Sequence, residues 1–355
     1  MKEMTSHERI KRMFEHREAD RVPITDSPWA STLERWYKQG MPAGTDFTDY
    51  FGLDKIIAVG IDTSPQYEAK VIEETDDYTI FTSNWGVTMR NWKHMGGVPE
   101  FLDFTITDED SWNKSKERMS IDRGRLPLDF LKENYPKWQN EGCWISANLW
   151  FGFDITHSWM CGTERVLMAI AMGDKWIRDV FDVCLDTNLA YYDMLFEEGY
   201  KFDEIFWCDD MGYKNHTFFS IDTYREMLKP VHKKACDWAK ERNMKVRLHS
   251  CGDVHTFIPD LIEIGVDMLN PVEVKAGMDP IALKAEYGDK LGFNGGLNAL
   301  LYNYPDQLWE EMDKVIPVMK ENGGYIISSD HSVPDCVTLE MFQKFVDKAK
   351  ELGKY

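Results

Sequence analysis

The sequence predicts an α/β protein, a closed (β/α)8 barrel with an N-terminal helical and β-hairpin elaboration. From about residue 143 onward, short apolar segments alternate with longer amphipathic ones, which is the pattern of parallel strands joined by crossover helices. About eight strand segments are counted along the chain, and 355 residues fit one barrel with insertions. An open doubly wound sheet is the alternative, but no G-x-G-x-x-G or G-x-x-x-x-G-K-[ST] motif follows a strand.

Residues 1–135 are expected to form the N-terminal elaboration together with the first strands. Strands are expected at Arg21–Thr25 and near Lys55–Gly60. From Glu68 to Trp92, apolar and polar residues alternate around turn signals at residues 75–77 and 84–86. This alternation predicts a hairpin or small meander.

Residues 143–355 are expected to carry the main strand–helix repeats, so that residues 1–355 form a single domain. Six further apolar strands are expected, at Trp144–Phe151, Glu204–Cys208, Lys245–Cys251, Asp267–Val272, Lys290–Asn294 and Gly324–Ser328. Helices are expected between and after them, at Ile221–Arg242, Thr256–Ile264, Asp279–Tyr287, Pro305–Asn322 and Thr338–Leu352. Ser220 and Asp279 are suited to cap helix N-termini, and Gly265 and Gly323 to follow C-termini.

Charge and cysteine content exclude several classes of protein. The 61 acidic residues exceed the 41 basic ones, and a net charge of −20 disfavours nucleic acid and anionic membranes as partners. No apolar run approaches 18 residues and the N-terminal segment lacks an apolar core, so a cytoplasmic location is expected. Seven cysteines without a C-x-x-C motif indicate reduced thiols, of which at least one is a candidate metal ligand.

His249 and Cys251 are the first candidates for a metal site. They stand two residues apart at the end of a predicted strand, so both side chains face the same side, and an imidazole with a thiolate suits zinc. His331, after the last strand, is a candidate third ligand, and Cys336 competes with it. Glu273 is a candidate fourth ligand or a residue that orients a ligand. Buried thiols and ordinary loop histidines are the alternative interpretation of these residues.

Other polar and aromatic residues fall at the same ends of the predicted strands. Asp210, next to Asp209, and Asn298 follow two of the strands and are candidates for positioning substrate or transferring protons. The chain holds 13 Trp, 15 Tyr and 19 Phe, and its share of Trp is high. Candidates for an aromatic pocket wall are Trp29, Trp150, Phe151, Phe153 and Trp207, although core packing accounts for about half of such residues.

Several segments together resemble the uroporphyrinogen decarboxylase superfamily. They are WCDDMGYK, the Ser-Ile-Asp-x-Tyr-x-Glu-x-x-Lys-Pro run, RLHSCGDV, LNPVEVKAGMDP, GFNGGLN, GGYIISSDHSVP and the opening HERIKRMFEHREADRVPI. The resemblance spans nearly the whole chain and implies a single TIM-like barrel. Decarboxylases of the superfamily carry R-Q-A-G-R after the first strand, whereas this chain has Thr25-Asp26-Ser27-Pro28. The chain is therefore more similar to the zinc-dependent methyltransferases that act with corrinoid proteins.

This resemblance implies the first half-reaction of corrinoid-dependent O-demethylation. A methyl group would move from a small-molecule donor to the Co(I) corrinoid (cobalamin) of a separate partner protein, with Zn²⁺ activating the donor oxygen. His249, Cys251 and His331 would hold zinc, with Glu273, although the family's distant third ligand is a cysteine. The aromatic residues favour a methoxylated aromatic donor, and a homodimer is left open.

Two other functions remain as alternatives at this point. One is metal-free decarboxylation of a carboxylated tetrapyrrole, which needs a cationic pocket to which Arg247 would contribute. The other is a non-enzymatic binding subunit or chaperone of a corrinoid protein.

Overall fold

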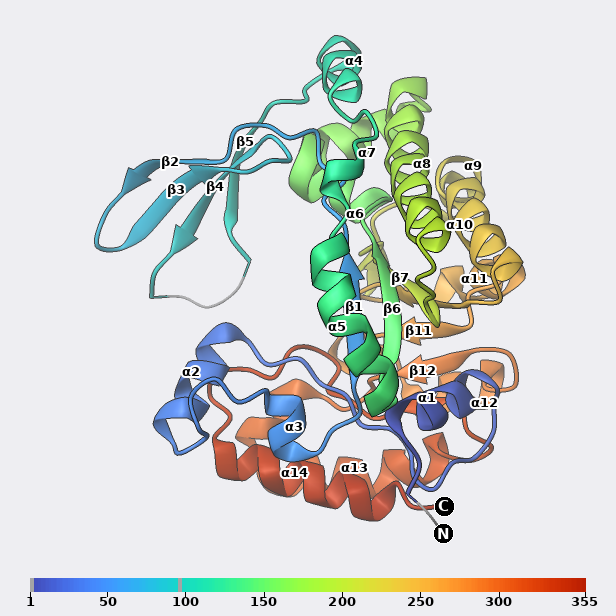
Figure 1. The fold of residues 1–355 in the computed structure, drawn as a ribbon. Helices are drawn as coiled ribbons and strands as arrows, with labels where there is room; N and C mark the ends of the chain where they lie inside the picture. The colour runs from blue at the N-terminus through green and yellow to red at the C-terminus, as the bar shows by residue number, and fades with distance from the viewer. Residues whose placement is uncertain (1–2, 95–97) are drawn as a thin grey trace.

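The computed structural model describes residues 3–94 and 98–355, and it shows a curved parallel sheet surrounded by helices (Figure 1). Seven strands follow the order β1-β6-β7-β10-β11-β12-β13, and every neighbouring pair is parallel. Their bounds are β1 Ile56–Gly60, β6 Trp144–Leu149, β7 Glu204–Cys208, β10 Lys245–His249, β11 Met268–Asn270, β12 Gly292–Asn294 and β13 Tyr325–Ile326. The order in the sheet is the order in the chain, with β2–β5 and β8–β9 in separate sheets, which is the topology of a (β/α)8 barrel.

The eighth position of the barrel is held by the predicted first strand, which is reduced to isolated bridges. Ile24 pairs in parallel with Ile327, directly after β13. On its other side, the Ile24 carbonyl accepts a hydrogen bond of 2.8 Å from the Asp54 amide, just before β1. Pro23 lacks an N–H group and cannot donate to a ladder, which explains why the pairing stays short. The predicted TIM-like barrel is confirmed.

The helices lie around this sheet. Their bounds are α1 Ser6–Phe14, α2 Ala30–Lys38, α3 Phe47–Phe51, α4 Glu109–Glu117, α5 Leu128–Glu141, α6 Phe153–Ile155, α7 Thr163–Met172, α8 Lys175–Glu197, α9 Ile221–Met227, α10 Lys229–Glu241, α11 Ile258–Ile264, α12 Pro280–Tyr287, α13 Pro305–Met319 and α14 Leu339–Leu352. Ser220 and Asp279 cap α9 and α12 as predicted. The helix expected at Ile221–Arg242 divides at Leu228, because Pro230 starts a new helix in its first turn. In the described residues, no helix combines the length and the apolarity needed to cross a membrane.

A four-stranded antiparallel meander extends sideways from the barrel, near α4 and α7 (Figure 1). Its strands are β2 Lys70–Glu74, β3 Tyr78–Thr82, β4 Val87–Trp92 and β5 Glu100–Phe104. The predicted turns at residues 75–77 and 84–86 separate β2 from β3 and β3 from β4, so this expectation is confirmed. The strand β5 was not predicted. A small hairpin, β8 Gly212–Tyr213 with β9 His216–Thr217, follows β7.

Candidate active site

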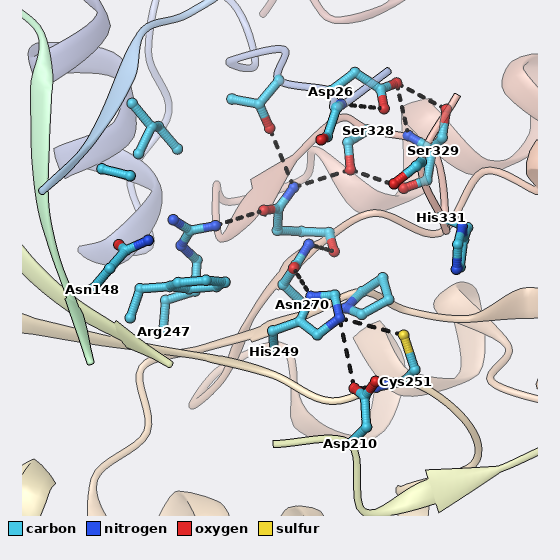
Figure 2. Close-up of a pocket in the computed structure, with 18 of the residues that line it drawn as sticks. Asp26, Asn148, Asp210, Arg247, His249, Cys251, Asn270, Ser328, Ser329 and His331 are labelled. Atoms are coloured by element: carbon cyan, nitrogen blue, oxygen red, sulfur yellow. Dashed lines mark hydrogen bonds and ion pairs between the residues drawn. The ribbon is translucent and has the colours of Figure 1, made fainter. Parts of the chain in front are cut away.

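A cavity of about 530 Å³ opens at the C-terminal ends of the barrel strands (Figure 2). Its walls come from β1, β6, β7, β10, β11 and β12 and from the loops at residues 25–29 and 328–332. Functional residues of (β/α)8 barrels gather at this end because the loops after the strands converge there. Most of the lining side chains are polar or charged, and Trp29 and Phe206 are the aromatic ones among the described lining residues.

His249 and Cys251 face each other in this cavity, as the alternation along their strand predicts. The Nε2 atom of His249 lies 3.3 Å from the Cys251 Sγ atom. The other ring nitrogen, Nδ1, lies 2.7 Å from Oδ1 of Asn270, the residue paired with His249 on the neighbouring strand β11. Because an amide oxygen only accepts hydrogen bonds, it favours a proton on Nδ1. Nε2 then keeps its lone pair for a ligand beside the thiol.

Cys208 and Asp210 complete a compact group of potential metal ligands with His249. Cys208 ends β7 and is the cross-strand partner of His249. Asp210 Oδ1 lies 3.6 Å from His249 Nε2 and 3.9 Å from Cys208 Sγ, and the ligand atoms of the three residues all lie within 4.8 Å of one another. Asp210 also accepts a hydrogen bond of 2.7 Å from the Cys251 amide, which ties the two strand ends together (Figure 2).

The electrostatics of this group suit a divalent cation. Burial, assisted by the negative charge of Asp210, raises the pKa of the Cys208 and Cys251 thiols well above their ordinary value. A bound cation would supply the positive charge that a thiolate needs here, since metal binding deprotonates a coordinating thiol. Two sulfur atoms, one imidazole nitrogen and one carboxylate oxygen are ligand types that zinc takes. The residues present therefore fit the zinc that the sequence suggests.

His331 lines the same cavity, whereas the competing Cys336 is exposed and lies outside the lining. The His331 ring stands 5.8 Å from the Trp29 ring, centre to centre. Burial lowers the pKa of His331, which favours the neutral imidazole that a metal or a substrate hydroxyl would meet. Of the two candidates for a third ligand, His331 is the one that lines the cavity, but it lies outside the group formed by Cys208, Asp210 and His249.

Glu273 binds the backbone of the loop that follows Cys251. Its Oε2 atom accepts a hydrogen bond of 2.6 Å from the Gly252 amide, and its Oε1 atom lies 3.5 Å from Lys275 Nζ. Both oxygen atoms therefore already hold positive or hydrogen-bonding groups. This arrangement matches the expected orienting residue better than a direct ligand.

Asn298 lies apart from this group. Its Oδ1 atom accepts a hydrogen bond of 3.0 Å from the Leu300 amide and caps the short helix η5 (Ala299–Asn303). It is not among the described residues that line the cavity. Asp210 is therefore the member of the expected pair that the fold brings to the pocket.

Of the predicted aromatic wall, the structure brings Trp29 to the cavity. Phe153 and Trp207 are completely buried, and Trp150 lines a smaller neighbouring cavity of about 110 Å³ that also contains Cys208. Alternation along β7 explains the difference: Trp207 packs away from the pocket, and Phe206 and Cys208 share the opposite face. The same alternation, read from the sequence, indicates that Phe206 faces the pocket, but Phe206 was not among the predicted residues.

Phe151, the remaining aromatic candidate, is also completely buried. Its ring packs 5.3 Å from that of Trp207, so both belong to the core. The aromatic excess of the chain thus serves packing in large part.

The floor of the cavity is a buried network around Arg247. Its Nη2 atom lies 2.6 Å from Glu204 Oε1, and its Nη1 atom donates to Asn294 Oδ1 at 3.4 Å. The guanidinium also stacks 4.4 Å from the centre of the Phe206 ring. Arg247 is the one lysine or arginine among the described residues of the lining, and its charge is already balanced by Glu204.

Asp209, the residue before Asp210, is a buried carboxylate that fixes the loop after β7. Asp209 is fully buried, with Oδ2 2.7 Å from His232 Nε2 and Oδ1 accepting a bond of 2.7 Å from the Asp154 amide. Gly152 approaches so closely that a Cβ atom there would lie 2.3 Å from Asp209 Oδ2. This packing fixes the strand end from which Asp210 projects.

Comparison with known proteins identifies the family of the chain. The family model described as uroporphyrinogen decarboxylase (URO-D) matches residues 156–352, more than half of the sequence. The chain belongs to the uroporphyrinogen decarboxylase family, as the sequence motifs predicted. Among solved structures, a methyltransferase from Methanosarcina mazei is similar in fold, with a TM-score of 0.63 and 16% sequence identity over 98% of this chain and 99% of that chain. No curated protein matches the sequence.

Proposed function

We propose that this protein is a zinc-dependent methyltransferase that moves a methyl group from a small methoxylated donor to the corrinoid of a partner protein. The observation that carries the proposal is the compact group of Cys208, Asp210 and His249 at the C-terminal end of the barrel, with the Cys251 thiol in contact with His249 Nε2. The similarity in fold to a protein named a methyltransferase supports it.

In this proposal His249 and Cys251 hold the metal, and Cys208 and Asp210 are the nearest further donors. Bound zinc would act as a Lewis acid toward the oxygen that carries the methyl group. Asn270 keeps the proton of His249 on Nδ1, and Asp210 joins the strand ends through the Cys251 amide. His331, which lines the cavity, would contact the donor or complete the ligand set.

The size of the cavity supports a small donor and a separate carrier for the corrinoid. A volume of about 530 Å³ accommodates a single-ring compound between polar walls. A whole corrinoid with its side chains is larger than this space, so its reactive face would have to be presented from outside. Trp29 and Phe206 offer the donor aromatic contacts, fewer than the sequence suggested.

The alternative of tetrapyrrole decarboxylation requires cations facing the substrate carboxylates. The guanidinium of Arg247 is already paired with the buried carboxylate of Glu204. Binding several further carboxylates at this site would bring like charges together without compensation. The structure therefore favours methyl transfer over this alternative.

Metal content and methyl transfer to free cob(I)alamin test the proposal together. We expect about one zinc per chain in the purified protein, and loss of both zinc and transfer in Cys251→Ser, because zinc would lose a thiolate ligand. Cys208→Ser should weaken zinc binding. Cys336→Ser is the matched control and should retain both properties, since this thiol is exposed outside the cavity.

His331→Ala separates the two roles open to this residue. Lost zinc would identify a ligand, and retained zinc with a raised KM would identify a donor contact. An active wild-type protein without metal, or a Cys251→Ser variant with unchanged zinc and activity, would refute the proposed zinc site.

A further inference from the structure

A second chemical group, separate from the metal-ligand candidates, faces the same cavity. Asp26 lies in the loop after the first barrel segment and lines the pocket with Ser328 and Ser329. Figure 2 shows these residues at one end of the cavity, with Asp210 and Cys251 at the other end. A donor held between the two ends would present its reactive oxygen to one and a different group to the other.

Asp26 is held in place by three hydrogen bonds. Its Oδ2 atom accepts from the Ser329 amide at 3.2 Å and from the Ser329 hydroxyl at 2.8 Å, and its Oδ1 atom accepts from the Ser27 amide at 2.9 Å. A carboxylate has about four acceptor sites. One acceptor site on Oδ1 thus remains for a ligand, on a side chain whose position is already fixed.

The surroundings of Asp26 make a hydrogen-bond donor the favourable partner. Asp26 is partly buried, and burial raises the pKa of this carboxyl to about 6, because the ionised form loses solvation. The nearby Asp330 adds negative charge, and Arg247, the one lysine or arginine among the described lining residues, is paired with Glu204. An anionic group at this end would be repelled, whereas an O–H or N–H group would be stabilised by a charge-assisted hydrogen bond.

We propose that Asp26 is a specificity-determining residue that binds an O–H or N–H group of the methyl donor and excludes anionic donors. This inference rests on the proposed methyltransferase function and assigns its substrate class: neutral or cationic methoxylated compounds with a second, hydrogen-bond-donating group. The Trp29 ring, three residues along the same loop, also lines the cavity and would contact such a donor.

The test is calorimetric binding of four probes to the zinc-loaded protein without any corrinoid. The probes are 2-methoxyphenol, 2-methoxybenzylammonium, 1,2-dimethoxybenzene and 2-methoxybenzoate. A hydrogen bond to a charged group corresponds to about 10- to 100-fold in affinity, so the first two should bind more tightly than dimethoxybenzene by this factor, and methoxybenzoate should bind most weakly. The ratio between the first two probes distinguishes a hydroxyl from an ammonium group as the preferred partner.

Asp26→Asn should reduce the preference over dimethoxybenzene by about tenfold and relieve the exclusion of methoxybenzoate, because the amide keeps the shape but not the charge. Asp335→Asn removes a negative charge from an exposed position on a neighbouring loop, outside the cavity, and should keep the wild-type ranking. Zinc content should be unchanged in both variants.

Equal binding of all four probes by the wild-type protein, binding of none, or an unchanged ranking in Asp26→Asn would overturn the assignment. The wild-type ranking decides the question even if Asp26→Asn fails to fold. Zinc content and methyl transfer are measured separately, so a protein that retains both without selectivity refutes the role of Asp26 alone.

Discussion

The buried ion pair beneath the cavity offers a direct test of the role of Arg247. Arg247→Met keeps most of the aliphatic volume and removes the guanidinium. The substitution deletes the hydrogen bonds to Glu204 and Asn294 and the stacking on Phe206. It leaves the Glu204 carboxylate, which is completely inaccessible to solvent, without its cation.

The expected magnitude follows from this geometry. Removing one partner of a buried pair costs about 3–5 kcal/mol, because the remaining charge is desolvated and uncompensated. For a chain of 355 residues, an unfolding entropy of about 2.1 cal/mol/K per residue converts that cost into a Tm lowered by about 4–7 °C. The double variant Glu204→Gln with Arg247→Met carries no charge at this buried pair, and we expect it to recover about 2 kcal/mol or more relative to Arg247→Met.

Differential scanning calorimetry and urea unfolding of the wild type, both single variants and the double variant measure these values. A Tm lowered by less than about 1 °C in Arg247→Met, or a double variant less stable than that single variant, would refute the reasoning. Such a result would mean that the guanidinium is not committed to Glu204 and is available to a substrate carboxylate, which would revive the decarboxylase alternative.

Two further predictions concern stability around the site. Gly152→Ala should destabilise the protein by about 2–4 kcal/mol more than Gly199→Ala in thermal unfolding. Both glycines have φ above +90°, but only the Cβ atom added at Gly152 would contact Asp209. Equal losses of stability in the two variants would contradict this contact. The pKa of Asp26 rises from 3.8 to about 6 on folding, so the folded chain binds the Asp26 proton more tightly than the unfolded chain does. The stability that the protonated carboxyl contributes is therefore lost as the pH rises from about 4 through 6. Asp26→Asn should therefore gain up to about 3 kcal/mol relative to the wild type between pH 4 and 7, and a difference in Tm that does not vary with pH would count against it.

Local patterns in the sequence were sufficient for much of the barrel. The strand predicted at Lys245–Cys251 is observed at Lys245–His249, because a short apolar run bounded by turn signals is typical of a buried parallel strand. The pairing of His249 with Cys251 followed from the alternation of side chains along one strand. The caps at Ser220 and Asp279 were predictable because a cap binds the backbone two or three residues away.

The same reasoning failed where a residue's neighbours come from another part of the chain. Trp207 was assigned to the pocket wall by its position at a strand end, yet its ring packs against His232 of α10 and is fully buried. Asn298 was assigned a role in the pocket, yet it caps its own short helix. Strand-end position indicates the right end of the barrel, but not which face of the strand or loop a side chain occupies.

The sequence by itself therefore determined the barrel and the His249–Cys251 pair, because these depend on periodicity and on spacings of a few residues. Its motifs also indicated the family by resemblance, which the family model confirms. Only the tertiary structure placed Cys208 beside His249, since that contact depends on the register between β7 and β10. It likewise brought Asp26 to the far end of the pocket through contacts with Ser329, about 300 residues away in the chain. Strand register and loop path are set by packing of the whole barrel, and no short stretch of sequence encodes them.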